Sequence, residues 1–174
     1  PELMPGAGRT VMGRLAFLVD QGIRFDVVFV HRDAEAQDPM LRRREVADGA
    51  QQAGVSCPVV AVVPVRMTEA WLLLDEQAIR QVAGKPSGRA PLGLPKANEV
   101  ERVADPKQLL ADVLMRAGEP AGRRRSQFKR DFGRSRALLL ERLDTRGAVA
   151  ELSAWKQLRA DIAAALADDR HDTL

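Results

Sequence analysis

The chain has 174 residues, which fits one domain or one domain with an extension. It is 45% hydrophobic and 29% charged, so it has enough apolar residues for a core and too many charges for a membrane protein. Its formal net charge is only +3, and this small excess neither requires nor excludes a nucleic-acid partner. The distribution of charge along the chain must therefore decide.

Cysteine, histidine and apolar residues exclude several classes of protein. Cys57 is the single cysteine and cannot form an internal disulfide, and no Cys/His group has the spacing of a zinc site. No apolar run approaches the length of about 18 residues needed to span a membrane, and the first residues lack a signal-peptide pattern. We therefore expect a soluble, cytoplasmic protein without a membrane partner.

The first half of the chain alternates helix and strand. Apolar periodicity and capping residues predict helices over 10–21, 38–53 and 68–82, and continuous apolar runs predict buried strands over 25–31 and 58–65. This order predicts an α/β fold with a parallel sheet flanked by helices. Because two strands are too few for a stable sheet, we expect a first strand that precedes Pro1 and is missing from this chain.

The second half of the chain reads as a helical extension. Prolines and glycines predict a loop over 85–104, after which Asp105-Pro106 predicts the start of a helix that ends at Gly118. Two further helices are predicted over 135–143 and 150–166. We therefore expect an α/β domain over 1–104 and a C-terminal helical extension over 105–174 packed on it.

Acidic residues follow both predicted strands. Asp33 and Glu35 come directly after the first strand, and in extended backbone their carboxylates project to the same side. Because Mg²⁺ and Mn²⁺ prefer carboxylate oxygens, these two residues are candidate metal ligands, and Glu69 after the second strand is a candidate third catalytic residue. The alternative is that Asp33 and Glu35 only solvate a turn and that Glu69 only interacts with a helix dipole. We expect Trp71 in the core and Asp75 on the surface.

The same segments resemble a known family. The segment Val28-Phe29-Val30-His31-Arg32-Asp33-Ala34-Glu35, the strand over 60–65, the segment Glu69-Ala70-Trp71-Leu72-Leu73-Leu74-Asp75 and Asp105-Pro106-Lys107 are together similar to a bacterial Toprim-related family labelled only as a domain of unknown function. The likeness spans residues 10–114 and is most specific at Glu69–Asp75.

This resemblance implies a fold related to the Toprim domains of topoisomerases, primases and nucleases of the overcoming-lysogenization-defect type. Such folds hold Mg²⁺ with a glutamate after the first strand and an Asp-x-Asp after a later strand. Asp33 and Glu35 would occupy the Asp-x-Asp positions, with Glu in the second place. The first-strand glutamate has no match, because Glu2 lies in no predicted strand. Relatives often accompany an ATPase in defence-type gene neighbourhoods, which implies an ATPase as a partner.

A basic segment over 122–136 is the second candidate site. It holds seven Lys and Arg residues against one acidic residue, interleaved with Phe128 and Phe132: Arg123, Arg124, Arg125, Lys129, Arg130, Arg134 and Arg136. Basic residues interleaved with aromatic ones suit a nucleic-acid backbone and its bases. The alternative is that the segment is basic only because arginine is abundant throughout the chain, which has 22 Arg and only 5 Lys. The run Arg42-Arg43-Arg44 is expected to be a solvated helix face.

These observations predict a Toprim-type, Mg²⁺-dependent nuclease in a defence-type system. The alternative is a non-catalytic Toprim-like module that docks on a partner ATPase or on nucleic acid, which the missing first-strand glutamate favours. A small-molecule phosphate binder is disfavoured because no glycine-rich phosphate loop follows either strand.

Overall fold

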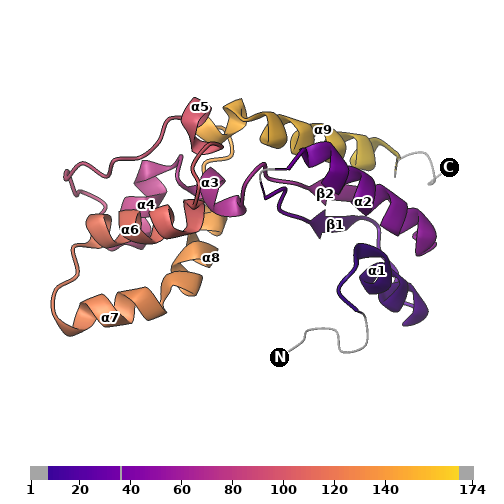
Figure 1. The fold of residues 1–174 in the computed structure, drawn as a ribbon, viewed down its shortest axis with the longest axis horizontal. Coiled ribbons are helices and arrows are strands. Elements are labelled where there is room, and N and C mark those ends of the chain that lie inside the picture. The colour runs from indigo at the N-terminus through magenta and orange to yellow at the C-terminus, as the bar shows by residue number, and fades with distance from the viewer. Residues whose placement is uncertain (1–7, 36, 169–174) are drawn as a thin grey trace. The chain divides into compact units, whose positions relative to one another are not determined.

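The computed structural model describes residues 8–35 and 37–168, with all their side chains except those of Arg123, Arg124, Lys129 and Asp168. The chain forms two compact units (Figure 1). Unit 1 comprises residues 1–65 and 156–174, and unit 2 comprises residues 66–155. Residue 104, at which the sequence predicts the end of the α/β domain, lies inside unit 2.

Unit 1 contains the sheet. Its elements are α1 (Val11–Asp20), β1 (Val28–His31), α2 (Pro39–Gln52), β2 (Val59–Val62) and the larger part of α9 (Ser153–Asp168). β1 and β2 are parallel and in register from Val28 opposite Val59 to His31 opposite Val62. α2 packs against α1 and β2. The predicted mixed α/β class, with a parallel sheet flanked by helices, is confirmed in this form.

The core of unit 1 forms where α1 and α2 meet the strand ends. Its buried members are Val11, Leu15, Ala34, Val46, Ala50, Ala61 and Val63. Gly49 allows the close approach of the two helices, since a Cβ on it would lie 3.0 Å from the backbone nitrogen of Met12. Ala34, which directly follows Asp33, is completely buried and fixes the chain after β1.

Three predicted helix starts are confirmed by side-chain caps. The Thr10 hydroxyl accepts a hydrogen bond from Gly13 N at 3.0 Å, Asp38 accepts one from Met40 N at 2.9 Å, and Asp105 accepts one from Gln108 N at 2.8 Å. In the last two cases proline occupies the first turn, where its missing N–H costs no hydrogen bond.

The described residues of unit 2 form helices joined by loops, with no strand among them. Its elements are α3 (Thr68–Leu72), α4 (Glu76–Val82), α5 (Ala97–Val100), α6 (Pro106–Gly118), α7 (Arg123–Arg130), α8 (Phe132–Arg142), the short 3₁₀ helix η1 (Ala148–Glu151) and the first residues of α9. α6 and α8 each pack against both α3 and α4. The largest fully buried side chains of the unit include Leu72, Leu73, Ile79, Leu110, Leu114 and Leu139.

The prediction of one helix over 68–82 is wrong. The helix ends after Leu72 and a second one begins at Glu76, because Asp75 caps α4 by accepting a hydrogen bond from Ala78 N at 2.9 Å. The other carboxylate oxygen of Asp75 accepts from Asp144 N at 2.9 Å. Asp75 is therefore a link between two segments of unit 2 rather than the surface residue that was expected. Thr68 is the first residue of α3 and not its cap, which is Met67.

No helix within residues 8–35 and 37–168 combines the length and the apolar character that crossing a membrane requires.

Candidate functional site

The chain beyond β1 is held rigidly. Backbone pairing continues past the last strand residue, with Arg32 N donating to Val62 O and Ala34 N donating to Pro64 O, both at 3.0 Å. Asp33 lies between these two hydrogen bonds, at the carboxyl end of a parallel strand. This is the edge at which open α/β sheets place their ligands.

Asp33 has an unsatisfied carboxylate oxygen. Its side chain is 28% exposed, yet its Oδ1 atom is buried and has no hydrogen-bond partner. His31 Nε2 lies 3.4 Å from this oxygen, which is an ion-pair distance when the imidazole is protonated. Buried carboxylate oxygens are normally hydrogen-bonded, because an unpaired one costs about 1–3 kcal/mol or more. Asp33 Oδ1 therefore has capacity for a further cation or donor.

Glu35 lies in a different backbone conformation. Its φ of +52° is left-handed, so the extended backbone from which we predicted two carboxylates on one side is absent at this residue. Its side chain is 72% exposed and its Oε2 lies 3.9 Å from Arg42 Nη2. Asp33 is thus a fixed, half-buried carboxylate, whereas Glu35 is an exposed one beside a guanidinium.

Two arginines share the carboxylate of Glu45 near the end of β1. Arg32 Nη2 lies 2.9 Å from Glu45 Oε1, and Arg42 Nη1 lies 3.0 Å from Glu45 Oε2. The Nε atoms of both arginines are buried without a hydrogen-bond partner. Asp33 instead pairs with His31, two residues before it, because alternate residues of extended backbone share a face. We call Arg32, Asp33, Arg42 and Glu45 the β1-end cluster.

The expectation that Arg42-Arg43-Arg44 forms a solvated face holds only for Arg44. Arg42 is 22% exposed within the β1-end cluster, and Arg43, also 22% exposed, donates to Asp161 Oδ2 at 2.6 Å. The sequence signal for Arg42 was its spacing from Glu45, since residues three apart on a helix lie on the same face.

Glu69 belongs to unit 2, whereas Asp33 and Glu35 belong to unit 1. The Glu69 side chain is 6% exposed and its Oε1 lies 2.8 Å from Arg136 Nε, although the angle is not that of a hydrogen bond. Arg136, predicted to hold a nucleic-acid backbone, places its guanidinium beside this buried carboxylate and is itself 38% exposed. Within the part of the chain that the structure describes, no three His, Cys, Asp or Glu side chains form a group that could hold a metal ion.

Trp71 lies in the core, as predicted. It is 4% exposed, and its ring meets that of Trp155 edge-on with centroids 5.1 Å apart. The residues around it on α3, from Thr68 to Leu72, are all buried. Residues 68–72 are thus a packing element of unit 2.

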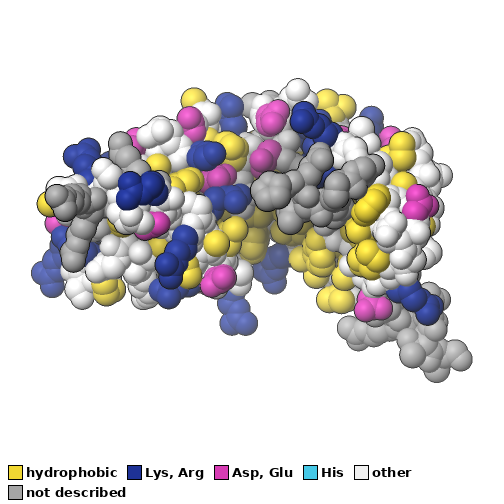
Figure 2. Space-filling view, turned by 90° about the horizontal axis from the view of Figure 1, so that it is seen from below, with side chains coloured by type: hydrophobic (Ala, Val, Ile, Leu, Met, Phe, Trp, Pro, Cys, Tyr) yellow, Lys and Arg dark blue, Asp and Glu magenta, His cyan; other side chains and the backbone are white. Residues whose placement is uncertain are grey.

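The basic segment forms α7 and the first turns of α8. Among its described side chains, Arg125, Arg130 and Arg134 are exposed, and Arg136 is turned toward Glu69. The side chains of Arg123, Arg124 and Lys129 lie outside the described ones. Figure 2 shows Lys and Arg side chains over the face of unit 2 that these helices form. Phe128 and Phe132 are half-buried and line a pocket against α6.

Comparison of the chain with protein-family models, with curated proteins and with solved structures gave no match.

Proposed function

We propose that the chain is a Toprim-like, Mg²⁺-dependent phosphodiester hydrolase that acts on nucleic acid, with Asp33 as its principal metal ligand. The observation that carries this proposal is the β1-end cluster, where Asp33 Oδ1, Arg32 Nε and Arg42 Nε are all buried without hydrogen-bond partners. A carboxylate oxygen without a hydrogen-bond partner at the end of a strand suits a divalent cation, and the two guanidinium groups on Glu45 at the same strand end supply positive charge for a phosphate.

The residues present fit such a metal. Mg²⁺ is commonly bound through one or two carboxylates, with waters and substrate phosphate completing its shell, so Asp33 alone is a sufficient anchor and Glu35 a second candidate ligand. When bound, the ion would polarise a phosphoryl oxygen and acidify a water molecule. Arg32 and Arg42 would orient the phosphate, since guanidinium groups bind phosphate oxygens in a fixed geometry. Water then adds to phosphorus, the bond to the leaving oxygen breaks, and that oxygen takes up a proton.

The basic segment of unit 2 supports a nucleic acid as the substrate. Arg125, Arg130 and Arg134 are exposed cations on α7 and α8, where they can neutralise backbone phosphates. Arg123, Arg124 and Lys129 are assigned the same role from their positions in the segment. Glu69 is the weakest of the proposed catalytic residues, because Arg136 already neutralises it.

Binding of Mn²⁺ to the full chain, followed by isothermal titration calorimetry, tests the metal site. The wild type should bind Mn²⁺, Asp33→Asn should lose at least tenfold in affinity, and cleavage of a labelled strand should fall in parallel. Asp26→Asn is a matched control, because Asp26 is an exposed aspartate just before β1, away from its carboxyl end. Absence of Mn²⁺ binding by the wild type, or equal binding by the Asp33 variant, would refute the proposal.

A non-catalytic Toprim-like module that docks on nucleic acid or on a partner ATPase is the second candidate. It is favoured by the two ion pairs Arg42–Glu35 and Arg136–Glu69, which engage two of the three proposed catalytic carboxylates. Such a module would bind nucleic acid or the ATPase equally well with and without Mn²⁺, and Asp33→Asn would leave that binding unchanged.

A further inference from the structure

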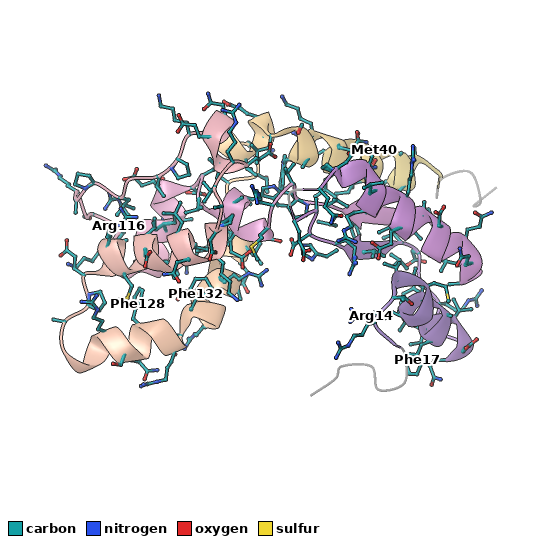
Figure 3. All side chains as sticks on the ribbon, viewed as in Figure 1. Arg14, Phe17, Met40, Arg116, Phe128 and Phe132 are labelled. Atoms are coloured by element: carbon teal, nitrogen blue, oxygen red, sulfur yellow. The ribbon has the colours of Figure 1, made fainter. Side chains whose placement is uncertain are left out.

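A pocket of about 350 Å³ lies in unit 2 between α6 on one side and α7 and α8 on the other (Figure 3). This volume lies within the range of small-ligand sites in proteins, which is about 300–1,000 Å³. The pocket is bounded by the same segment, α7 and the start of α8, that holds most of the chain's clustered arginines. The residues that line the pocket indicate which chemical groups of a ligand it can bind.

Two phenylalanine rings form the apolar wall. Phe128 and Phe132 are four residues apart and both half-buried, one near the end of α7 and the other at the start of α8. Figure 3 shows Phe128 in the space between α6 and α7. Gly118 leaves room for this ring, since a Cβ at Gly118 would lie 3.1 Å from Phe128 Cε2. Such a wall offers an aromatic surface to a planar ligand.

Polar groups line the opposite wall, on α6. Lys107, Gln108 and Asp112 face the pocket, and Gln108 Nε2 donates to Asp112 Oδ1 at 3.0 Å. Asp105 and Asp112 outnumber Lys107 in the lining, so its formal charge is negative, which disfavours a phosphate there. Carboxylate and amide oxygens instead suit the exocyclic amino groups of nucleobases.

The surrounding surface has the opposite charge. Arg125, Arg130 and Arg134 are exposed on the helices that form the aromatic wall. Arg116 and Arg125 line an adjacent open hollow that shares Asp112 and Met115 with the pocket. Apart from Lys107, the cations named here lie outside the pocket and the aromatic rings inside it. A single-stranded nucleic acid has the complementary arrangement, with its phosphates outermost and its bases free to turn inward.

We propose that this pocket binds one unstacked base of a single-stranded nucleic acid against Phe132 and Phe128, while α7 and α8 hold the flanking phosphates. The inference rests on the proposed function and narrows its substrate to single strands. In a duplex, pairing and stacking would keep the base out of the pocket.

The test compares two fluorescently labelled strands of about 12 nucleotides, one of deoxycytidine and one abasic, by anisotropy in the presence of EDTA. The two strands carry the same backbone charge, so only base contacts distinguish them. The full wild-type chain should bind the deoxycytidine strand about tenfold or more tightly than the abasic one. Phe132→Leu and Phe128→Leu, which keep apolar volume and remove the ring, should abolish most of this difference without changing the dependence on salt.

Phe29→Leu is the matched control, because Phe29 is 52% exposed on β1 in unit 1 and should leave both affinities unchanged. Tryptophan fluorescence shows whether unit 2 of each variant is folded. Arg130→Ala should lower the affinity for both strands equally and reduce the dependence of binding on salt concentration.

Equal affinity of the wild type for both strands would overturn the inference, and so would binding of neither strand. The inference would also be overturned if folded Phe132→Leu and Phe128→Leu preferred the deoxycytidine strand as strongly as the wild type does. The two rings would then be packing residues or a contact for a protein partner. Because EDTA removes divalent metal, this result is independent of the Mn²⁺ experiment. Failure of Asp33 to bind metal would therefore refute the hydrolase and leave single-strand binding intact.

Discussion

Replacing Arg136 with alanine should destabilise unit 2 by about 2 kcal/mol. The Glu69 side chain is 6% exposed, and the guanidinium of Arg136 lies 2.8 Å from its carboxylate. Removing one partner of a fully buried ion pair costs about 3–5 kcal/mol, because a charge is left uncompensated in a medium of low dielectric constant. Arg136 is itself 38% exposed, so water reaches the pair and the expected cost falls below that range.

The two tryptophans make this prediction measurable for unit 2 alone. Trp71 and Trp155 are the only tryptophans in the chain, both belong to unit 2, and their rings are in edge-on contact. Their fluorescence during urea unfolding therefore follows this unit. With a denaturant dependence of about 2 kcal/mol per molar urea, the loss corresponds to a lowering of the midpoint by about 1 M.

A double-mutant cycle separates the ion pair from other effects of the substitution. Glu69→Gln should cost less than Arg136→Ala, because it leaves a half-exposed guanidinium that water can solvate, and the double variant should recover part of the loss of Arg136→Ala. Arg134→Ala removes an exposed arginine from the same helix and should change stability by less than about 0.5 kcal/mol. Equal midpoints for Arg136→Ala and Arg134→Ala would refute the reasoning, because Glu69 would then need no guanidinium.

Two further predictions concern packing in unit 1 and pH in unit 2. Gly49→Ala should destabilise unit 1 by about 1–3 kcal/mol, measured by thermal unfolding in circular dichroism, because the new Cβ would lie 3.0 Å from Met12 N and from Val11 Cγ1; an unchanged melting temperature would contradict this packing. Burial raises the pKa of Glu101 above 4.5, so its charged form penalises the folded state above the raised pKa, and the penalty is relieved as the pH falls through it. Glu101→Gln should therefore be more stable than the wild type at pH 7, and the difference should vanish at a pH well below the ordinary pKa of the carboxyl, where folded and unfolded states are both protonated. Urea unfolding at the two pH values checks this, and equal stability of the two proteins at pH 7 would contradict it.

The helix starts could be predicted because their chemistry is local. Asp38-Pro39 and Asp105-Pro106 each contain an acceptor for a nearby backbone N–H and a residue that needs no hydrogen bond in the first turn. The break at Asp75 could not be predicted in this way, since that side chain also holds the backbone of Asp144, a distant part of the chain. Apolar periodicity predicted one helix over residues 68–82 because it contains no information about such distant partners.

The candidate site likewise contains features that local sequence predicts and features that depend on distant residues. The position of Asp33 follows from the strand that precedes it, and a strand is visible as an apolar run. The backbone of Glu35 and the sharing of Glu45 by Arg32 and Arg42 depend on how α2 packs after β1, which no local pattern specifies. The pairing of Glu69 with Arg136 likewise joins residues of α3 and α8.

The burial of the Glu69 carboxylate and that of Asp33 Oδ1 have different explanations, and the difference indicates which residue is the better candidate for catalysis. Every neighbour of Glu69 on α3 is buried, Trp71 packs on Trp155, and Arg136 neutralises the carboxylate, so the folding of unit 2 accounts for the whole segment. A likeness to a family at this segment can therefore reflect a shared core as well as a shared activity. Asp33 differs, because its Oδ1 is buried without a hydrogen bond, with His31 Nε2 at 3.4 Å. This difference is the reason that the proposed metal is assigned to Asp33 and not to Glu69.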